Sequence, residues 1–258
     1  MRKRFYVVFV LLMTFVFLLA ACTRDGMGPH MGPQMAPVES APSQGGLLYD
    51  KWWVVSGAVE PETNHPLWAL QDTNTRSGSA TWQCKECHGW DYIGKDGAYG
   101  EGSHYTGFPG VYDASQAKTG GQLLDALTGG TDDRHDFSPV LSEAALQDLV
   151  DFLKDYMIDD TKYINYDTKE AIAANVVSGK ALYSQTCRGC HGSDGKRINF
   201  GSSEEPEYVG TLASGNPWET LHKIRFGNPG TSMPSAIASG WSIQNMVDVL
   251  GYAQTLPK

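Results

Sequence analysis

The most constraining feature of this 258-residue chain is a five-residue pattern that occurs twice, at Cys84–His88 and Cys187–His191. Each copy has a cysteine, a second cysteine three positions later and a histidine directly after it. The chain has one further cysteine, Cys22, so its total of five is odd. An odd count in an exported chain calls for an explanation, and a modification of Cys22 would supply it.

The pattern is typical of covalent haem attachment. The two thiols add across the haem vinyl groups, and one helical turn places both sulfurs beside the same porphyrin edge. The histidine that follows is carried under the iron. Two disulfides, a redox-active cysteine pair or a four-cysteine zinc site are alternatives. None of them requires the histidine, and the roughly 100 residues between the copies do not suit a compact zinc ribbon.

The chain resembles the diheme class I c-type cytochromes from about Leu47 to Lys258. The stretch Gly179–Gly195 is similar to the first helix and haem-attachment turn of that family. The resemblance implies a mainly α fold of two tandem, small, cytochrome c-like helical domains, 47–160 and 161–258. Each domain would wrap long Gly/Pro-rich loops around one covalent haem c. The attachment residues it implies are Cys84, Cys87, Cys187 and Cys190, with His88 and His191 as iron ligands.

The second axial ligand of haem 2 is predicted from a loop. Met233 and Pro234 follow Arg225–Ser232, a stretch rich in Gly, Pro and Ser, and the Met-Pro pair resembles the axial-methionine loop of the family. A methionine outside any helical pattern is a poor candidate for core filling. We therefore expect Met233 to be the distal ligand of haem 2.

The first half has no Met-Pro pair, so its distal ligand must differ. When Gly129 is aligned with Gly227 without a gap, His135 falls on Met233. His135 is thus the candidate for haem 1. The alternatives are His104, in a Gly-rich stretch, Met157, an open site, and a plain surface position for His135 among its charged neighbours.

Apolar periodicity and capping residues predict the helices. Ser142 and Ser242 are expected to cap two helices that correspond in the two halves, and a one-residue shift aligns Leu146, Leu149, Val150 and Leu153 with Ile243, Met246, Val247 and Leu250. Trp52–Val55 fits either a strand or a short helix. The predicted helices are 82–88, 121–127, 142–157, 171–191, 217–226 and 242–256.

The N-terminus has the layout of a bacterial lipoprotein signal. Three basic residues precede the apolar run Phe5–Ala20, which is shorter than the roughly 20 residues that a spanning helix needs. The run ends in Leu19–Cys22, which resembles the lipoprotein box. We expect 1–21 to be removed, Cys22 to be lipidated, and 22–46 to be a flexible Met/Gly/Pro-rich tether. The protein would then be exported and anchored in the cell envelope, by resemblance at the outer membrane, facing periplasm or cell surface.

The net charge of the chain and the expected haem ligands then limit the possible functions. Without residues 1–21 the chain has 17 basic and 29 acidic residues, a net charge of −12, which argues against nucleic-acid binding. A haem with both axial positions filled by protein suits electron transfer between redox partners, from haem 1 with two histidines to haem 2 with His and Met, because methionine raises the potential. A peroxidase-like diheme enzyme with an open or labile haem, or a haem subunit of a larger oxidoreductase, stays open, and no catalytic residue is assigned.

Overall fold

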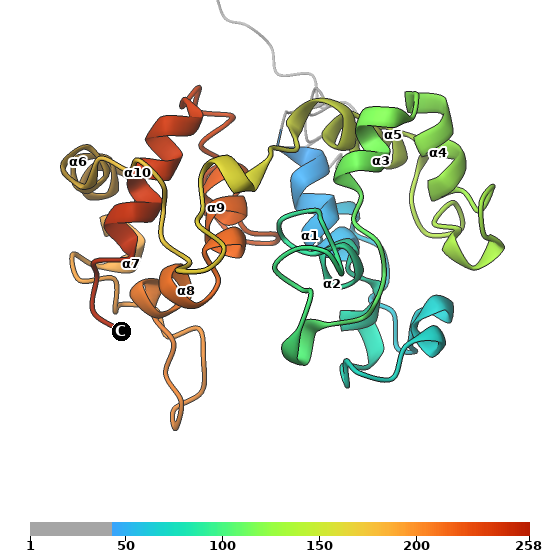
Figure 1. Cartoon of the computed structure of the whole chain (residues 1–258), viewed down its shortest axis with the longest axis horizontal. Coiled ribbons are helices and arrows are strands. Elements are labelled where there is room, and N and C mark those ends of the chain that lie inside the picture. Colours follow the sequence, from blue (N-terminus) through green and yellow to red (C-terminus); the bar gives the residue numbers. More distant parts are fainter. Residues whose placement is uncertain (1–42) are drawn as a thin grey trace, which may run out of the picture. The chain divides into compact units, whose positions relative to one another are not determined.

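The computed structural model describes residues 43–258; residues 1–42, with the predicted signal, Cys22 and most of the tether, lie outside it. The described residues belong to one compact helical unit and contain no β-strand. No helix in this part of the chain combines the length and apolar character needed to cross a membrane. Figure 1 shows the α-helices, which are α1 (Gln44–Ser56), α2 (Cys84–His88), α3 (Tyr112–Ala117), α4 (Gly120–Leu127), α5 (Glu143–Asp151), α6 (Val176–Thr186), α7 (Arg188–His191), α8 (Val209–Gly215), α9 (Pro217–Phe226) and α10 (Ile243–Ala253).

Several sequence predictions are confirmed and others need correction. The hydroxyl of Ser142 accepts a hydrogen bond from the Ala145 amide and caps α5, and Ser242 caps α10 in the same way through Asn245. Trp52–Val55 is helical, because it belongs to α1. The helix predicted over 142–157 continues past α5 as a π-helical turn, Phe152–Tyr156. The helix predicted over 171–191 begins only at Val176, where the Asn175 side chain caps it.

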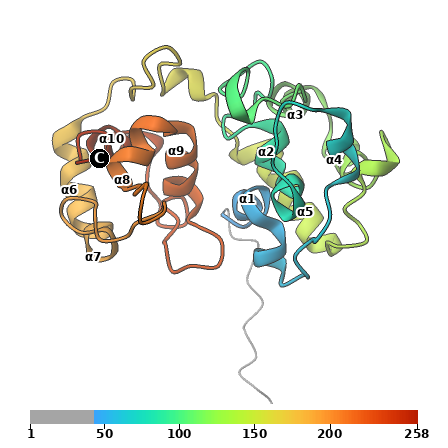
Figure 2. The same cartoon turned by 90° about the horizontal axis from the view of Figure 1, so that it is seen from below.

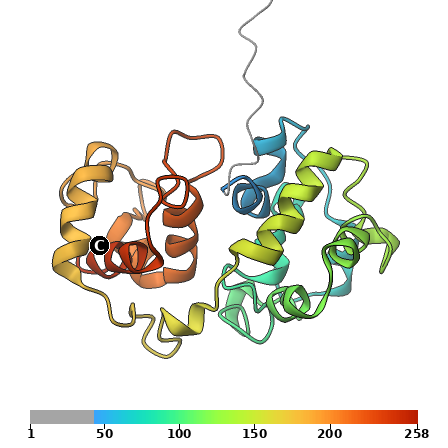
Figure 3. The ribbon, with the colours of Figure 1, turned by 90° about the horizontal axis from the view of Figure 1, so that it is seen from above.

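One helix crossing occurs in both halves. Helix α1 packs on α5, and α6 packs on α10 (Figure 3). At each crossing a glycine lies against a backbone carbonyl: a Cβ on Gly45 would lie 2.1 Å from Asp148 O, and one on Gly179 would lie 1.9 Å from Asp248 O. Such distances leave no room for any side chain. The two crossings therefore depend on glycine for the same reason.

The crossings also correct the helix register. Because Asp148 and Asp248 occupy the same place, Leu146 corresponds to Met246, and not to Ile243 as the sequence alignment proposed. The error is three residues, which keeps nearly the same helix face toward the core. Apolar periodicity alone therefore does not distinguish the two registers.

Helix α1 begins before the expected start of the first domain. The composition of 22–46 predicted a tether up to Gly46, whereas α1 starts at Gln44 and buries both Gly45 and Gly46. These two glycines look like linker residues in the sequence. In the structure they allow close packing, since a Cβ on Gly46 would meet the Phe226 ring at 2.3 Å.

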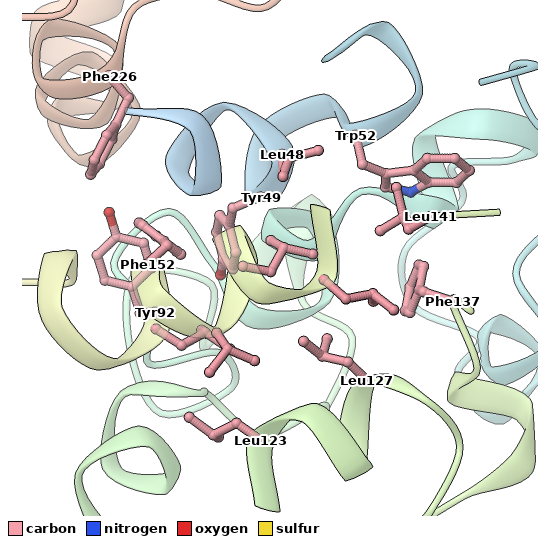
Figure 4. Close-up of a cluster of buried hydrophobic side chains, with 14 of the residues drawn as sticks. Leu48, Tyr49, Trp52, Tyr92, Leu123, Leu127, Phe137, Leu141, Phe152 and Phe226 are labelled. Carbon is pink, nitrogen blue, oxygen red and sulfur yellow. The ribbon is translucent and has the colours of Figure 1, made fainter. Parts of the chain in front are cut away.

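Helix α9 connects the second half to the core of the first. Phe226, from α9, packs against Phe152 beside α1, as Figure 4 shows. The buried ring of His222 donates from Nε2 to the Gly46 carbonyl at 3.0 Å and accepts at Nδ1 from the Tyr92 hydroxyl at 2.9 Å. Because burial lowers the pKa of His222 well below its usual value, the ring is neutral, as this bonding pattern requires.

Arg225 completes the contact from the same helix. Its guanidinium donates to the Tyr92 hydroxyl at 3.0 Å and to the Tyr156 carbonyl, and the side chain is 3% exposed. The carbonyl of Arg225 accepts from the Ile237 amide at 3.1 Å. One residue therefore links the first-half core to the loop that contains Met233.

Replacing Gly179 with alanine is expected to destabilise the protein by up to about 2 kcal/mol, since overpacking of a tight contact costs about 1–3 kcal/mol and the helix propensity of alanine returns about 1 kcal/mol. The matched control is Gly215→Ala, at the end of α8, where no atom lies within 4 Å of the added Cβ. Denaturant unfolding of the holoprotein gives both values. Equal stability of the two variants would contradict the packing argument.

Candidate haem-binding sites

The two cysteine-histidine motifs adopt the same local structure. Helix α2 contains the first motif, and Cys187 with α7 contains the second. Helical spacing of three places the two sulfurs of each motif on one side. None of the four thiols forms a disulfide. Both pairs are therefore available for thioether bonds.

A glycine with positive φ ends each motif and turns the chain sharply. Gly89 has φ 79° and ψ 159°, and Gly192 has φ 84° and ψ 164°. A tyrosine hydroxyl from the preceding long helix holds each turn: Tyr49 donates to Gly89 O at 2.7 Å, and Tyr183 donates to Gly192 O at 3.0 Å. Only glycine adopts this conformation without strain. The first helix of each half thus fixes the orientation of its own motif.

The structure brings His88 and His135 together. Their ring centroids lie 6.3 Å apart, with the ring planes at 79°. An iron held between two imidazoles keeps the ring centres about 6.4 Å apart, from about 2 Å per metal–nitrogen bond and about 1.2 Å from nitrogen to ring centre. The cavity that both rings line is a narrow slot of about 50 Å³. The spacing of the two rings fits one iron between them, whereas the slot is smaller than the roughly 300–1,000 Å³ of usual cofactor pockets, so a porphyrin requires the slot to widen.

Hydrogen bonds orient both rings toward the slot. Nδ1 of His88 lies 2.7 Å from the Pro109 carbonyl, and Nδ1 of His135 lies 2.9 Å from the Ala126 carbonyl. A carbonyl only accepts, so each Nδ1 carries the proton and each Nε2 keeps its lone pair for a metal. Burial lowers the pKa of His88 to about 4, so this ring is neutral at pH 7. This is the protonation state that an iron ligand needs.

The glycine alignment that pointed to His135 also has a structural basis. Gly129 and Gly227 both have positive φ, 84° and 91°. A Cβ on Gly227 would lie 2.7 Å from Met233 O, and one on Gly129 would lie 3.2 Å from the Asp136 side chain. In each half the glycine lets the loop close on itself, so that the residue six positions later lines the cavity.

The other two first-half candidates do not line this slot. The ring of His104 stacks on Tyr99 at 4.4 Å, and its Nδ1 lies 3.6 Å from the carboxylate of Glu86, which is 1% exposed. Met157 packs on the hydrophobic core of the first half. His104 and Met157 are thus held in other contacts, and among the three candidates only His135 faces His88.

Glu86, inside the first motif, contacts residues that do not line the slot. Its carboxylate accepts from the Asn74 side-chain amide at 3.0 Å and pairs with Arg76 at 3.1 Å. Burial raises the pKa of Glu86, but the neighbouring His104, Lys85 and Arg76 and the Asn74 amide outweigh it, so that the pKa is lowered overall. The buried carboxylate ties two loops to α2.

His191 and Met233 line one cavity in the second half, with Cys187 and Cys190. The cavity measures about 550 Å³, within the usual range for cofactor pockets. Nδ1 of His191 is buried and has no hydrogen-bond partner among the described residues. Burial also lowers the pKa of His191. Apolar side chains dominate the remaining wall, among them Ile198, Val209, Leu212, Ile224, Trp241 and Val249.

This donor set fits a haem. A neutral imidazole and a thioether are known axial ligands of haem iron, and an apolar wall suits a porphyrin face. The free cysteines stand at the edge of the same cavity, where they can bind the vinyl carbons. The cavity therefore has the size, lining and ligand types of a c-type haem site.

A comparison with protein families agrees for this half. Residues 174–252 match the model described as cytochrome c oxidase, cbb3-type, subunit III. This segment is a cytochrome c domain. The matched residues contain Cys187, Cys190, His191 and Met233, and the family implies a covalently bound haem c and electron transfer with redox protein partners. No curated protein and no solved structure matches the chain.

The sequence analysis missed one residue of the first slot. His65 lines it beside His88 and His135, and is 6% exposed. It lies on segment 57–83, between α1 and α2, which has no equivalent in the second half because α6 leads directly into Cys187. The one available signal was Pro66, since proline after a capping residue often marks the start of a helical turn.

Proposed function

We propose that the chain is a diheme c-type cytochrome of two tandem domains, 47–160 and 161–258, and that it transfers single electrons between redox proteins. The observation that carries the proposal is the His88–His135 pair, with rings 6.3 Å apart and both Nδ1 atoms bonded to carbonyls. With Cys84 and Cys87 it supports a covalent haem 1 in the first half, beyond the matched segment. His191 and Met233 would hold haem 2.

Each residue has a defined role in this mechanism. The four cysteines keep the haems in place, and the carbonyls of Pro109 and Ala126 hold the two imidazoles of haem 1 in one tautomer. Haem iron supplies the one-electron redox couple. Ligation by His88 with His135 and by His191 with Met233 would leave no coordination site for a substrate, so the protein would exchange single electrons only. Ligation by Met233 would raise the potential of haem 2 above that of haem 1, so electrons would enter at haem 1 and leave from haem 2.

A potentiometric titration of the holoprotein tests this order. We expect two haems per chain and two one-electron steps, because the two ligand pairs differ. In Met233→His the upper step should move down while the lower step stays in place. A single haem, equal potentials, or a Met233→His variant in which the lower step moves would contradict the proposal.

We also propose that the protein is exported and lipid-anchored to the cell envelope through Cys22, on the basis of the sequence that precedes it. Lipidation would also leave the remaining four cysteines as two haem pairs. In Cys22→Ser the protein should leave the membrane fraction, whereas retention there would contradict the anchor.

A further inference from the structure

His65 is a buried imidazole with one ring nitrogen unbonded. Its ring is 6% exposed and lines the slot between His88 and His135. It packs against the ring of Trp82 with centroids 4.5 Å apart and against Phe137 at 5.6 Å. These contacts restrict ring rotation, so the imidazole keeps one face and one edge toward the slot.

The backbone around His65 determines which nitrogen carries the proton. The His65 amide donates to Thr81 Oγ1 at 2.8 Å, which fixes the main chain. Nδ1 of His65 accepts from the Leu67 amide at 3.2 Å. An acceptor nitrogen has no proton, so the ring proton of His65 is on Nε2. Among the described residues Nε2 has no hydrogen-bond partner.

This protonation state separates His65 from the two candidate iron ligands. His88 and His135 carry the proton on Nδ1 and keep the Nε2 lone pair free. His65 carries it on Nε2, so its free N–H is a hydrogen-bond donor at the slot that this side chain lines. To bind iron through Nε2, His65 would have to give up its bond to Leu67. It is therefore a donor in this slot and not a third ligand.

A haem offers an acceptor of the required kind. The porphyrin faces and most of its edge are apolar, and the strong acceptors on its rim are the two propionate carboxylates. We infer that His65 donates from Nε2 to a propionate of the haem held by His88 and His135, and so acts as a positioning and potential-setting residue. The inference rests on the proposed haem 1. No counterpart exists in the second half, because segment 57–83 is absent there.

The bond would raise the reduction potential of haem 1. A carboxylate beside the iron stabilises the oxidised, more positive state, and a hydrogen bond from a neutral donor disperses that negative charge. Loss of the donor therefore favours the oxidised form. The effect falls on one haem only, so haem 2 serves as an internal reference in the same molecule.

Replacement of His65 by Asn or by Gln tests the roles of its two ring nitrogens one at a time. In His65→Asn, Oδ1 can still accept from the Leu67 amide, but no donor reaches the position of Nε2. In His65→Gln, the longer side chain places an N–H near that position. In the holoprotein, we expect His65→Asn to lower the midpoint potential of haem 1 and to shift its propionate bending band in the resonance Raman spectrum. His65→Gln should stay close to the wild type on both measurements.

Several outcomes would overturn the inference. They are an unchanged haem 1 potential in His65→Asn, equal losses in both amide variants, and carbon monoxide binding by His65→Asn, which would make His65 a ligand. If His65→Asn does not fold, His65→Phe keeps the aromatic packing and should show the same lowered potential. Absence of haem 1 from the wild-type protein is a different result, because it refutes the proposed function before His65 is tested.

Discussion

Replacing His135 with alanine is expected to open one iron of the reduced holoprotein to carbon monoxide and to leave the other closed. The substitution removes the ring that faces His88 at 6.3 Å and leaves the thioether cysteines and His88 in place. Haem 1 then keeps its covalent attachment and loses one axial ligand. We expect carbon monoxide binding to rise from none to about one molecule per chain, measured by Soret titration.

The matched control for this prediction is His104→Ala. His104 was the other histidine that the sequence offered, and it lies beside Glu86 and Tyr99, outside the slot. This variant should bind no carbon monoxide. If His104→Ala opens an iron and His135→Ala does not, the assignment of the haem 1 ligand is wrong.

The double variant Cys187→Ala/Cys190→Ala is expected to lose haem 2 and the folded structure of α6 and α10. Without covalent attachment, the cavity of about 550 Å³ lacks the group that fills it. The apolar wall of this cavity would then face water, at a cost of about 25 cal/mol per Å² of exposed apolar surface. A whole domain has only about 5–15 kcal/mol of stability. Hydrogen exchange should show α6 and α10 unprotected, whereas α9 keeps its contacts with the first half.

Met233→Ala is the control that distinguishes filling of the cavity by the haem from ligation of the haem iron. It keeps both thioether bonds, so the haem stays in the cavity, while the iron loses one axial ligand. We expect protection of α6 and α10 to be retained and carbon monoxide to bind at haem 2. If the double-alanine variant retains the same protection as Met233→Ala, the haem is not the main support of this half.

The parts of the fold that the sequence predicted are those set by local chemistry. The spacing of Cys84, Cys87 and His88 corresponds to one helical turn, so it can be recognised without a structure. Ser142 and Ser242 mark helix starts because each hydroxyl bonds an amide three residues later. Local signals of this kind were sufficient to predict α5 and α10.

The parts that it missed depend on contacts between distant residues. The sequence around Gly45 and Gly46 is typical of a linker. Glycine is required there because a Cβ would collide with the carbonyl of Asp148 or the ring of Phe226. The residue-by-residue correspondence between α5 and α10 also follows from the two helix crossings, at Asp148 and Asp248. His65 is 70 residues from His135 in sequence, and its place beside that ring follows from the path of segment 57–83.

The hydrogen-bond network between the halves had no signal in the sequence. Tyr92 is 130 residues from His222 and 133 from Arg225, yet the three form one buried chain of donors and acceptors (Figure 2 shows α9, the helix that contains His222 and Arg225). None of the three stands in a recognisable motif. Such a network is apparent only when the packing is known.

Carbon monoxide binding to the dithionite-reduced, purified holoprotein tests the central claim most directly. The proposal predicts two haems per chain and no fast binding at either, because His88 with His135 and His191 with Met233 would occupy both coordination positions of each iron. Stoichiometric binding at one haem would contradict the electron-carrier proposal. It would indicate an open or easily opened iron, as the peroxidase-like alternative requires, and peroxide turnover would be the next measurement.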